Sequence, residues 1–209
     1  MIVIEIQSLA VFFTASLLLA LAPGPDNIFV LTQSALNGRA AGFRVTLRLC
    51  TGLVVHTTAV ALGVAAVFRS SAVAFTLLKF LGAGYLVYLA VQAFRASGEG
   101  GKSKVGTLGP WQLYRRGIIM NVTNPKVSIF FLAFLPQFAD PARGSLVAQM
   151  FLLGGVFVAA TLMVFGSISL LSGALGEALA GSSGAKRILN RIAGSVFALL
   201  ALRLVTAQR

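Results

Sequence analysis

The stretch Pro23-Gly24-Pro25-Asp26-Asn27 interrupts the first long apolar part of the chain. Residues 6–22 and most of residues 28–36 are apolar, so two prolines, a glycine and an acid stand between two apolar runs. A lipid bilayer offers no hydrogen bonds to a broken helix and no solvation to a carboxylate. If the flanking runs cross a membrane, a break that carries a charge indicates a functional site.

Composition indicates that these runs do cross a membrane. Hydrophobic residues make up 57% of the 209-residue chain and charged residues 11%, against about 25% charged residues in soluble proteins. A spanning helix needs roughly 20 mostly apolar residues. We therefore predict an all-α polytopic membrane protein, a single integral membrane domain over residues 1–209 with six transmembrane helices. The six segments are about 6–36, 43–68, 72–94, 117–135, 146–171 and 188–207.

The net charge of +12 is distributed as membrane topology requires. Lys and Arg gather in the first, third and fifth connections between the apolar segments, and the second and fourth connections are poorer in them. The positive-inside rule then places the odd connections in the cytoplasm and both termini outside. Because the positive charge does not line one amphipathic face, we expect no nucleic-acid partner.

Residues 96–110 are rich in glycine and serine, which is typical of a flexible linker. This predicted cytoplasmic linker divides the chain into two three-helix repeats, residues 1–95 and 111–209. A shift of 100 residues places Pro25 on Pro125 and Asp26 on Lys126, and Gly82 falls on Gly194 at a shift of 112. Three helices per half reverse the direction of insertion, so the repeats are predicted to be inverted, a common plan in secondary transporters.

Both breaks are predicted to lie near the middle of the bilayer. Twelve residues separate Pro25 from Asn37 and eleven separate Pro125 from Pro136. At 1.5 Å per residue these stretches are about 18 Å and 16 Å long, and the hydrocarbon core is roughly 30 Å thick. The breaks therefore approach the midplane from opposite faces, where inverted repeats place a substrate.

The two breaks offer complementary groups to a zwitterion. Pro25 and Pro125 each remove a helical hydrogen bond and are expected to free the carbonyls of Leu21 and Asn121. Asn124 followed by Pro125 is typical of a helix N-cap and first residue. Freed carbonyls attract an ammonium group and a helix N-terminus attracts a carboxylate, so a zwitterionic amino acid suits the pair.

Asp26 and Lys126 allow two interpretations. Asp26 could bind a substrate ammonium or a proton, and Lys126 could bind a substrate carboxylate. The alternative is a permanent structural Asp26–Lys126 ion pair. Lys126 lies in the first turn of a predicted helix, where the helix dipole disfavours a cation, so we expect an anion beside it.

The other polar positions also keep two interpretations. His56, the only histidine, could carry a proton in coupled transport or donate an interhelical hydrogen bond. Asn27, Asn121 and Asn124 could line the substrate site or satisfy freed backbone groups. We expect most of a set of six glycines within the predicted helices to mark close contacts between helices. They are Gly52, Gly63, Gly82, Gly84, Gly155 and Gly166.

Several motifs resemble those of the LysE/RhtB amino-acid exporters. The first is Ala22-Pro23-Gly24-Pro25-Asp26-Asn27, followed by Gly38-Arg39-Ala40-Ala41-Gly42 and Gly52-Leu53-Val54-Val55-His56. The others are Phe80-Leu81-Gly82-Ala83-Gly84-Tyr85-Leu86-Val87-Tyr88-Leu89, Asn121-Val122-Thr123-Asn124-Pro125-Lys126 and Phe130-Phe131-Leu132-Ala133-Phe134-Leu135-Pro136-Gln137-Phe138. The resemblance runs over essentially the whole chain. It implies export of amino acids or close derivatives across the bacterial inner membrane by proton exchange.

The sequence thus favours a secondary active exporter of a small zwitterion with protons as the coupling ion, in a lipid bilayer and without a cofactor. A homo-oligomer is compatible with it. Pro25, Asp26, Asn27, Asn121, Asn124, Pro125 and Lys126 are the predicted substrate site, and Asp26 and His56 the candidates for proton coupling. The alternative is a transporter of another small solute or of a metal cation, although one histidine and the single Cys50 supply few metal ligands. An enzyme is not expected, because no nucleophile–base constellation is present.

Overall fold

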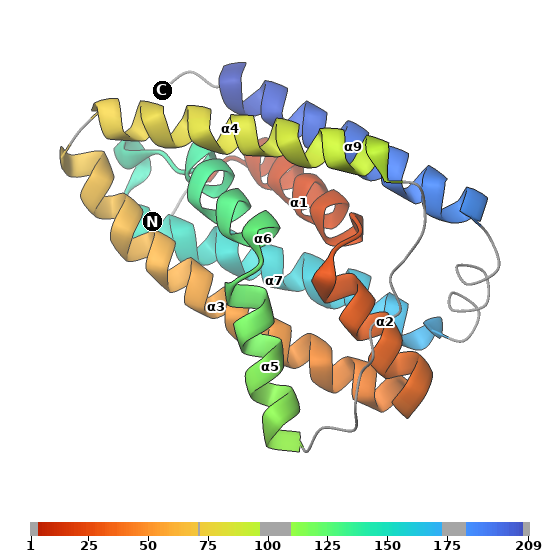
Figure 1. Cartoon of the computed structure of the whole chain (residues 1–209). Helices are drawn as coiled ribbons and strands as arrows, with labels where there is room; N and C mark the ends of the chain where they lie inside the picture. The colour runs from red at the N-terminus through yellow and green to blue at the C-terminus, as the bar shows by residue number, and fades with distance from the viewer. Residues whose placement is uncertain (1–3, 71, 97–109, 173–182, 207–209) are drawn as a thin grey trace.

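The chain is a bundle of helices, described here from a computed structural model over residues 4–70, 72–96, 110–172 and 183–206 (Figure 1). All regular elements in these ranges are helical, which confirms the all-α prediction. They are α1 (Ile6–Leu21), α2 (Pro25–Asn37), α3 (Arg39–Ser70), α4 (Ala72–Arg95), α5 (Pro110–Val122), α6 (Pro125–Ile129), the π-helical η1 (Phe130–Phe134), the 3-10 helices η2 (Leu135–Phe138) and η3 (Pro141–Arg143), α7 (Leu146–Leu170) and α9 (Ser183–Thr206).

Two helices are broken where the sequence predicts. α1 and α2 meet at 61°, and Tyr114–Val122 meets Pro125–Phe138 at 50°. A proline stands at the start of both α2 and α6, where its missing N–H leaves no helical bond unmade and its fixed φ suits the first turn. Both breaks are therefore confirmed as breaks, and their depth in a bilayer stays a prediction.

Length and apolar composition identify fewer crossings than the six predicted. Within the described ranges, Arg39–Gly63 of α3 and Leu146–Leu170 of α7 could each span a membrane, and each bent pair could form one further span. The predicted segments 72–94 and 188–207 correspond to α4 and α9, which contain residues outside the described set, so their spans are not tested and stay predictions. The structure thus accounts for up to four spans, and the six-span topology stays a prediction.

The bundle is built on two long helix pairs. The most extensive contacts join α4 to α9 and α3 to α7, and these partners run side by side in Figure 1. The first half of each broken helix packs on one member of the second pair, α1 on α7 and α5 on α3. Aromatic side chains fill the centre of the larger of two apolar cores. They are Phe12, Phe130, Phe131, Phe134, Phe138 and Phe157.

The second broken helix loses α-helical geometry soon after it restarts. Pro136 has no N–H, and its ring would clash with the carbonyl four residues earlier in an α-helix. The chain instead widens into the π-helical η1 and then tightens into η2, which contains Pro136. A π-helical turn is often found at a functional site, and the apolar pattern of this segment gives no sign of it.

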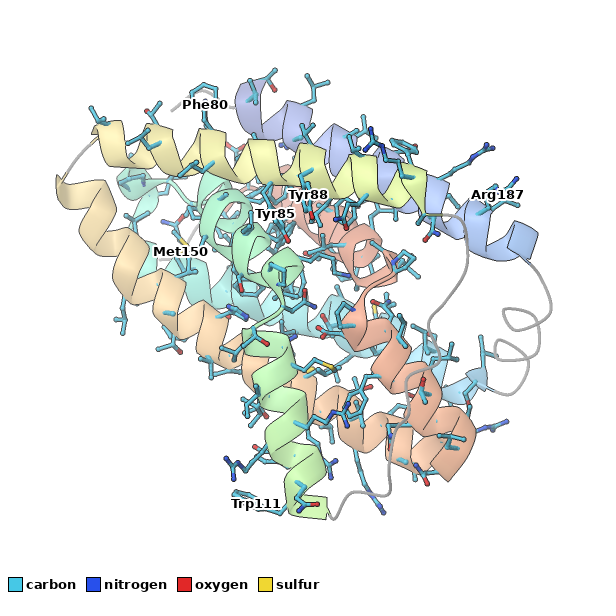
Figure 2. All side chains as sticks on the ribbon, in the orientation of Figure 1. Phe80, Tyr85, Tyr88, Trp111, Met150 and Arg187 are labelled. Atoms are coloured by element: carbon cyan, nitrogen blue, oxygen red, sulfur yellow. The ribbon has the colours of Figure 1, made fainter. Side chains whose placement is uncertain are left out.

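The two ends of the bundle differ. At one end Arg143 pairs with Glu5 at the start of α1, at 2.5 Å, and with Asp140, at 3.1 Å. The buried Gln149 holds the same loop through the N–H and carbonyl of Asp140. At the other end, Trp111 stacks on Tyr114 at the exposed start of α5 (Figure 2).

Half of the six glycines expected at helix contacts make one. A Cβ on Gly82 would lie 2.1 Å from Cβ of Ala133 in η1, so α4 packs on η1 through this glycine. Gly52 and Gly166 are also close to other helices. Gly63, Gly84 and Gly155 have nothing within 4 Å of an added Cβ, and the expectation fails for them.

We predict that Gly82→Ala destabilises the bundle and that Gly84→Ala does not. Alanine favours a helix by about 1 kcal/mol over glycine at either position, whereas overpacking against Ala133 costs about 1–3 kcal/mol. The melting temperature of detergent-purified protein should fall for Gly82→Ala and stay level or rise for the matched Gly84→Ala. Equal melting temperatures would contradict the close contact.

Candidate functional site

Lys126 ties the two breaks together. It lies in the first turn of α6, and its Nζ donates hydrogen bonds to the carbonyls of Leu19, at 3.2 Å, and Ala22, at 2.8 Å. The last carbonyls of a helix have no partner within it and form the negative end of its dipole. The cation that the N-terminus of α6 disfavours is therefore placed against the C-terminus of α1, where it is favoured.

Gly24 makes this contact sterically feasible. A Cβ at this position would lie 3.0 Å from Nζ of Lys126 and 3.4 Å from its Cε. The φ of Gly24 is −175°, an extended conformation open to any residue, so a side chain here is disfavoured by its close approach to Lys126 and not by backbone geometry.

Asp26 is buried at the start of α2, but it does not pair with Lys126. One carboxylate oxygen, Oδ2, accepts a hydrogen bond from Nδ2 of Asn121 at 2.8 Å, and the other, Oδ1, has no partner. Both ion pairs found in the described part of the chain are made by Arg143. The alternative of a permanent Asp26–Lys126 ion pair is thus wrong for this conformation, because Lys126 bonds backbone carbonyls instead.

Two of the three asparagines satisfy backbone groups at the breaks. Nδ2 of Asn27 donates to the carbonyl of Ala20 at 2.6 Å. Oδ1 of Asn124 accepts from the N–H of Lys126 at 3.1 Å, which confirms the predicted N-cap. At the end of α1, side-chain donors reach the carbonyls of Leu19, Ala20 and Ala22, and none reaches the expected Leu21. α1 ends before Pro25 could displace a partner of Leu21.

His56 joins α3 to the second break. Its Nε2 lies 3.1 Å from the carbonyl oxygen of Asn121, the group that Pro125 was expected to free. A carbonyl only accepts, so Nε2 carries the hydrogen in this contact. Gly52, one turn earlier, leaves space for Asn121: a Cβ there would lie 2.5 Å from Oδ1 of Asn121. The interhelical hydrogen bond is confirmed, and proton transfer by His56 stays a prediction.

A cavity of about 410 Å³ lies between the two breaks and the α4–α9 pair. The first break contributes Pro23, Gly24 and Pro25, and the second contributes Asn124, Pro125 and Lys126. This volume is within the usual range for small-ligand sites. The opposite wall carries polar side chains that have no charge. They are Tyr85, Tyr88 and Gln92 of α4, and Asn190 of α9.

The remaining predicted residues lie behind this cavity. Asp26 and Asn121 border a separate space of about 10 Å³, which Lys126 also lines. Asn27 instead borders a groove of about 490 Å³ between α1, α2 and α7, whose lining is almost wholly apolar. That groove offers little to a charged ligand, so the polar chemistry of the site lies in the first two spaces.

Sequence reasoning missed the polar wall of the larger cavity. Tyr85, Tyr88 and Gln92 recur at three- and four-residue spacing, so they share one face of α4. Figure 2 shows both tyrosines projecting from α4 toward the broken helices, and Gln92 donates a short hydrogen bond to the hydroxyl of Tyr88. A polar stripe on an otherwise apolar segment was the available signal.

Comparison with known proteins identifies the family. Residues 17–208 match the family model of the LysE type translocators. The chain belongs to the LysE type translocator family. This confirms the resemblance that its motifs suggested.

Relatives of this LysE type translocator align over nearly their whole length. A homoserine/homoserine lactone efflux protein of Salmonella typhi is 33% identical over 94% of this chain and 95% of its own. A leucine efflux protein of Salmonella choleraesuis is 28% identical over 94% of each chain. A membrane protein of Vibrio cholerae serotype O1 is 30% identical over 94% of this chain and 96% of its own. No solved structure matches the chain significantly.

We predict that Asn124→Ala lowers the melting temperature of this translocator. The substitution removes the acceptor for the N–H of Lys126, and loss of an N-cap costs about 1 kcal/mol. Asn124→Ser keeps a capping oxygen and should recover most of the loss. A thermal scan of detergent-purified protein measures the three melting temperatures. Equal values for Ala and Ser would contradict the capping role.

Proposed function

We propose that this chain is a secondary active exporter of amino acids or small amino-acid derivatives, working by proton-coupled antiport with alternating access. The observation that carries the proposal is the cavity between the two breaks, with Lys126 on its wall. Membership of the LysE type translocators and two relatives named as efflux proteins support it. We place the chain in the bacterial inner membrane with both termini outside.

The contacts of Lys126 suggest how a zwitterion binds. In this structure the ammonium of Lys126 donates hydrogen bonds to the carbonyls of Leu19 and Ala22. A bound amino acid brings a carboxylate for Lys126 and an ammonium of its own for those carbonyls, so each partner of the present contact gains a replacement. Pro25 and Pro125 keep the backbone open at this point, and Asp26, in the smaller space that Lys126 also lines, is the candidate to act on the ammonium or a proton.

The polar wall points to a substrate with an uncharged side chain. No acidic residue is among the described residues that line the larger cavity. A dibasic amino acid would leave its second ammonium without a counter-charge there, at a considerable desolvation cost. Tyr88, Gln92 and Asn190 instead present hydroxyl and amide groups that suit a neutral hydroxyl, lactone or apolar side chain.

The packing supports an inverted repeat. In the predicted repeat α3 corresponds to α7 and α4 to α9, and these are the pairs with the most extensive contacts. Helices related by a two-fold axis near their interface contact each other in this way. We therefore propose six transmembrane segments, with α4 and α9 as the third of each half. The larger cavity reaches Ala96, beside the predicted cytoplasmic linker, so it would open to the cytoplasm.

The alternative of a metal-cation transporter gains no support from the site. In the described part of the chain no three His, Cys, Asp or Glu side chains gather as a metal site requires. Cys50 is buried in the apolar core.

We predict that inverted membrane vesicles containing this chain accumulate neutral amino acids when the vesicle interior is acidified. A panel of radiolabelled homoserine, homoserine lactone, leucine, lysine and glutamate should give uptake of the neutral members and little of lysine or glutamate. Vesicles from cells without the chain are the control. Uptake that ignores the pH gradient would contradict antiport, and preferential lysine uptake would contradict the neutral subsite.

We predict that Lys126→Met raises the half-saturating substrate concentration about 10- to 100-fold, because a hydrogen bond to a charged group contributes about 1.5–3 kcal/mol. The matched control is Lys79→Met, since Lys79 of α4 is not among the residues that line the cavity. Initial rates of uptake over a range of substrate concentrations measure both variants. Equal half-saturation in wild type and Lys126→Met would exclude Lys126 from the site.

A further inference from the structure

The small space beside Asp26 is bordered by oxygen atoms that lack partners. Oδ1 of Asp26, Oδ1 of Asn121 and Oγ1 of Thr161 are buried and make no hydrogen bond. Their residues are 2%, 2% and 3% exposed, and all three line the same space. A buried polar atom without a partner costs about 1–3 kcal/mol. Three of them around one space are evidence of a ligand that completes their hydrogen bonds.

Thr161 is distinctive among the buried threonines. Thr46 and Thr57 of α3 each donate their hydroxyl to the carbonyl four residues earlier in the same helix. Thr161, in the middle of α7, does not satisfy its hydroxyl in this way and borders the small space instead. Its oxygen is therefore available to a ligand, and no feature of the apolar helix around it explains a hydroxyl there.

The size and charge of the space limit that ligand. Its volume of about 10 Å³ is close to the smallest that holds one water molecule. The unpartnered atoms of the residues that line the space are oxygens, and each can accept a hydrogen bond. Lys126 of α6 lines the same space, so a sodium ion would lie against an ammonium group, and it would need more oxygen ligands than the three present. A proton needs one carboxylate and one acceptor.

We propose that Asp26, Asn121 and Thr161 form a proton site that is separate from the substrate cavity. Lys126 lines both the proton site and the substrate cavity. The Asp26 carboxylate takes up one proton and becomes a carboxylic acid, whose O–H donates to Oγ1 of Thr161 or Oδ1 of Asn121, directly or through one water. Nδ2 of Asn121 keeps its bond to the other oxygen. This inference rests on the proposed function, since it assigns the coupling ion of that transport to specific atoms.

The charged and titratable groups around Asp26 are few. Lys126 faces it from α6, and His56 approaches it from α3 through the carbonyl of Asn121. α1 and α7, which also border the space, carry no charged residue within Ile6–Leu21 and Leu146–Leu170. The charge on Asp26 is therefore felt most directly by Lys126, which also lines the substrate cavity.

The test is Thr161→Val, which keeps the shape of the side chain and removes the acceptor. The matched control is Thr46→Val, a buried threonine whose hydroxyl bonds its own helix. Loss of one acceptor weakens proton binding about two- to tenfold. For Thr161→Val, half-maximal uptake into inverted vesicles should need a proton concentration higher than in wild type by that factor. Its pH midpoint should therefore be lower. For Thr46→Val, the pH midpoint and the exchange of labelled for unlabelled substrate without a gradient should both stay within about twofold of wild type.

The outcomes separate this inference from the proposed function. If wild-type vesicles exchange no member of the amino-acid panel, the proposed function fails. If they exchange and respond to pH, but Thr161→Val keeps the wild-type pH midpoint, only the proton site is overturned. Uptake driven by a sodium gradient at constant pH and lost in Thr161→Val would also overturn it.

A second measurement does not depend on transport. Infrared difference spectra of the purified protein at high and low pH should show the carbonyl stretch of a protonated buried carboxyl. The band should be absent in Asp26→Asn, shifted in Thr161→Val and unchanged in Thr46→Val. A band that is identical in wild type and Thr161→Val overturns the hydrogen bond to Thr161.

Discussion

The hydrogen bonds from Lys126 to the end of α1 are the contact on which the rest of the site depends. An ammonium group buried in an apolar bundle needs acceptors, and the carbonyls of Leu19 and Ala22 are available only because α1 stops there. The second break requires the first in return, since Lys126 is delivered by the restart of α6 at Pro125. Each break thus supplies what the other lacks, and Gly24 provides the space for them to meet.

Much of this arrangement could be predicted from local chemistry. Pro25, Pro125 and Asn124 determine where helices stop and restart, because a missing N–H and a capping oxygen act within one turn. The partner of Lys126 could not be predicted in the same way. The prolines indicated that carbonyls would be freed near the breaks, but only the packing of α6 against α1 identifies the carbonyls of Leu19 and Ala22 as the partners of Lys126. Thr161 was missed for a related reason, since its free hydroxyl depends on where α7 lies relative to α2 and α5.

Two polar spaces on either side of one lysine give the site a functional logic. The larger is lined by neutral polar groups and by both breaks, and the smaller is lined by Asp26, the one buried acid among the residues that the structure describes. In a single mixed site, the substrate and the proton would compete directly for the carboxylate of Asp26. With the two spaces separated by Lys126, the charge at Asp26 can change without removing any group that contacts the substrate side chain. In the proposed mechanism, substrate specificity and proton coupling therefore depend on different residues.

The two ends of the bundle differ in the way expected for one state of the proposed alternating-access carrier. One end is tied by Arg143 to Glu5 and Asp140, and the larger cavity extends to Ala96 toward the other end. The side chains of Arg143 and Glu5 are 41% and 54% exposed, and such exposed ion pairs contribute only about 0–1 kcal/mol. A ligand shifts an equilibrium between two states by the difference between its binding free energies for them. Because the contacts at this end are weak, a small difference of this kind would be enough to open it. The buried contacts of Lys126 lie instead at the breaks, and in the proposed alternating-access cycle they would hold the two halves together while one end closes and the other opens.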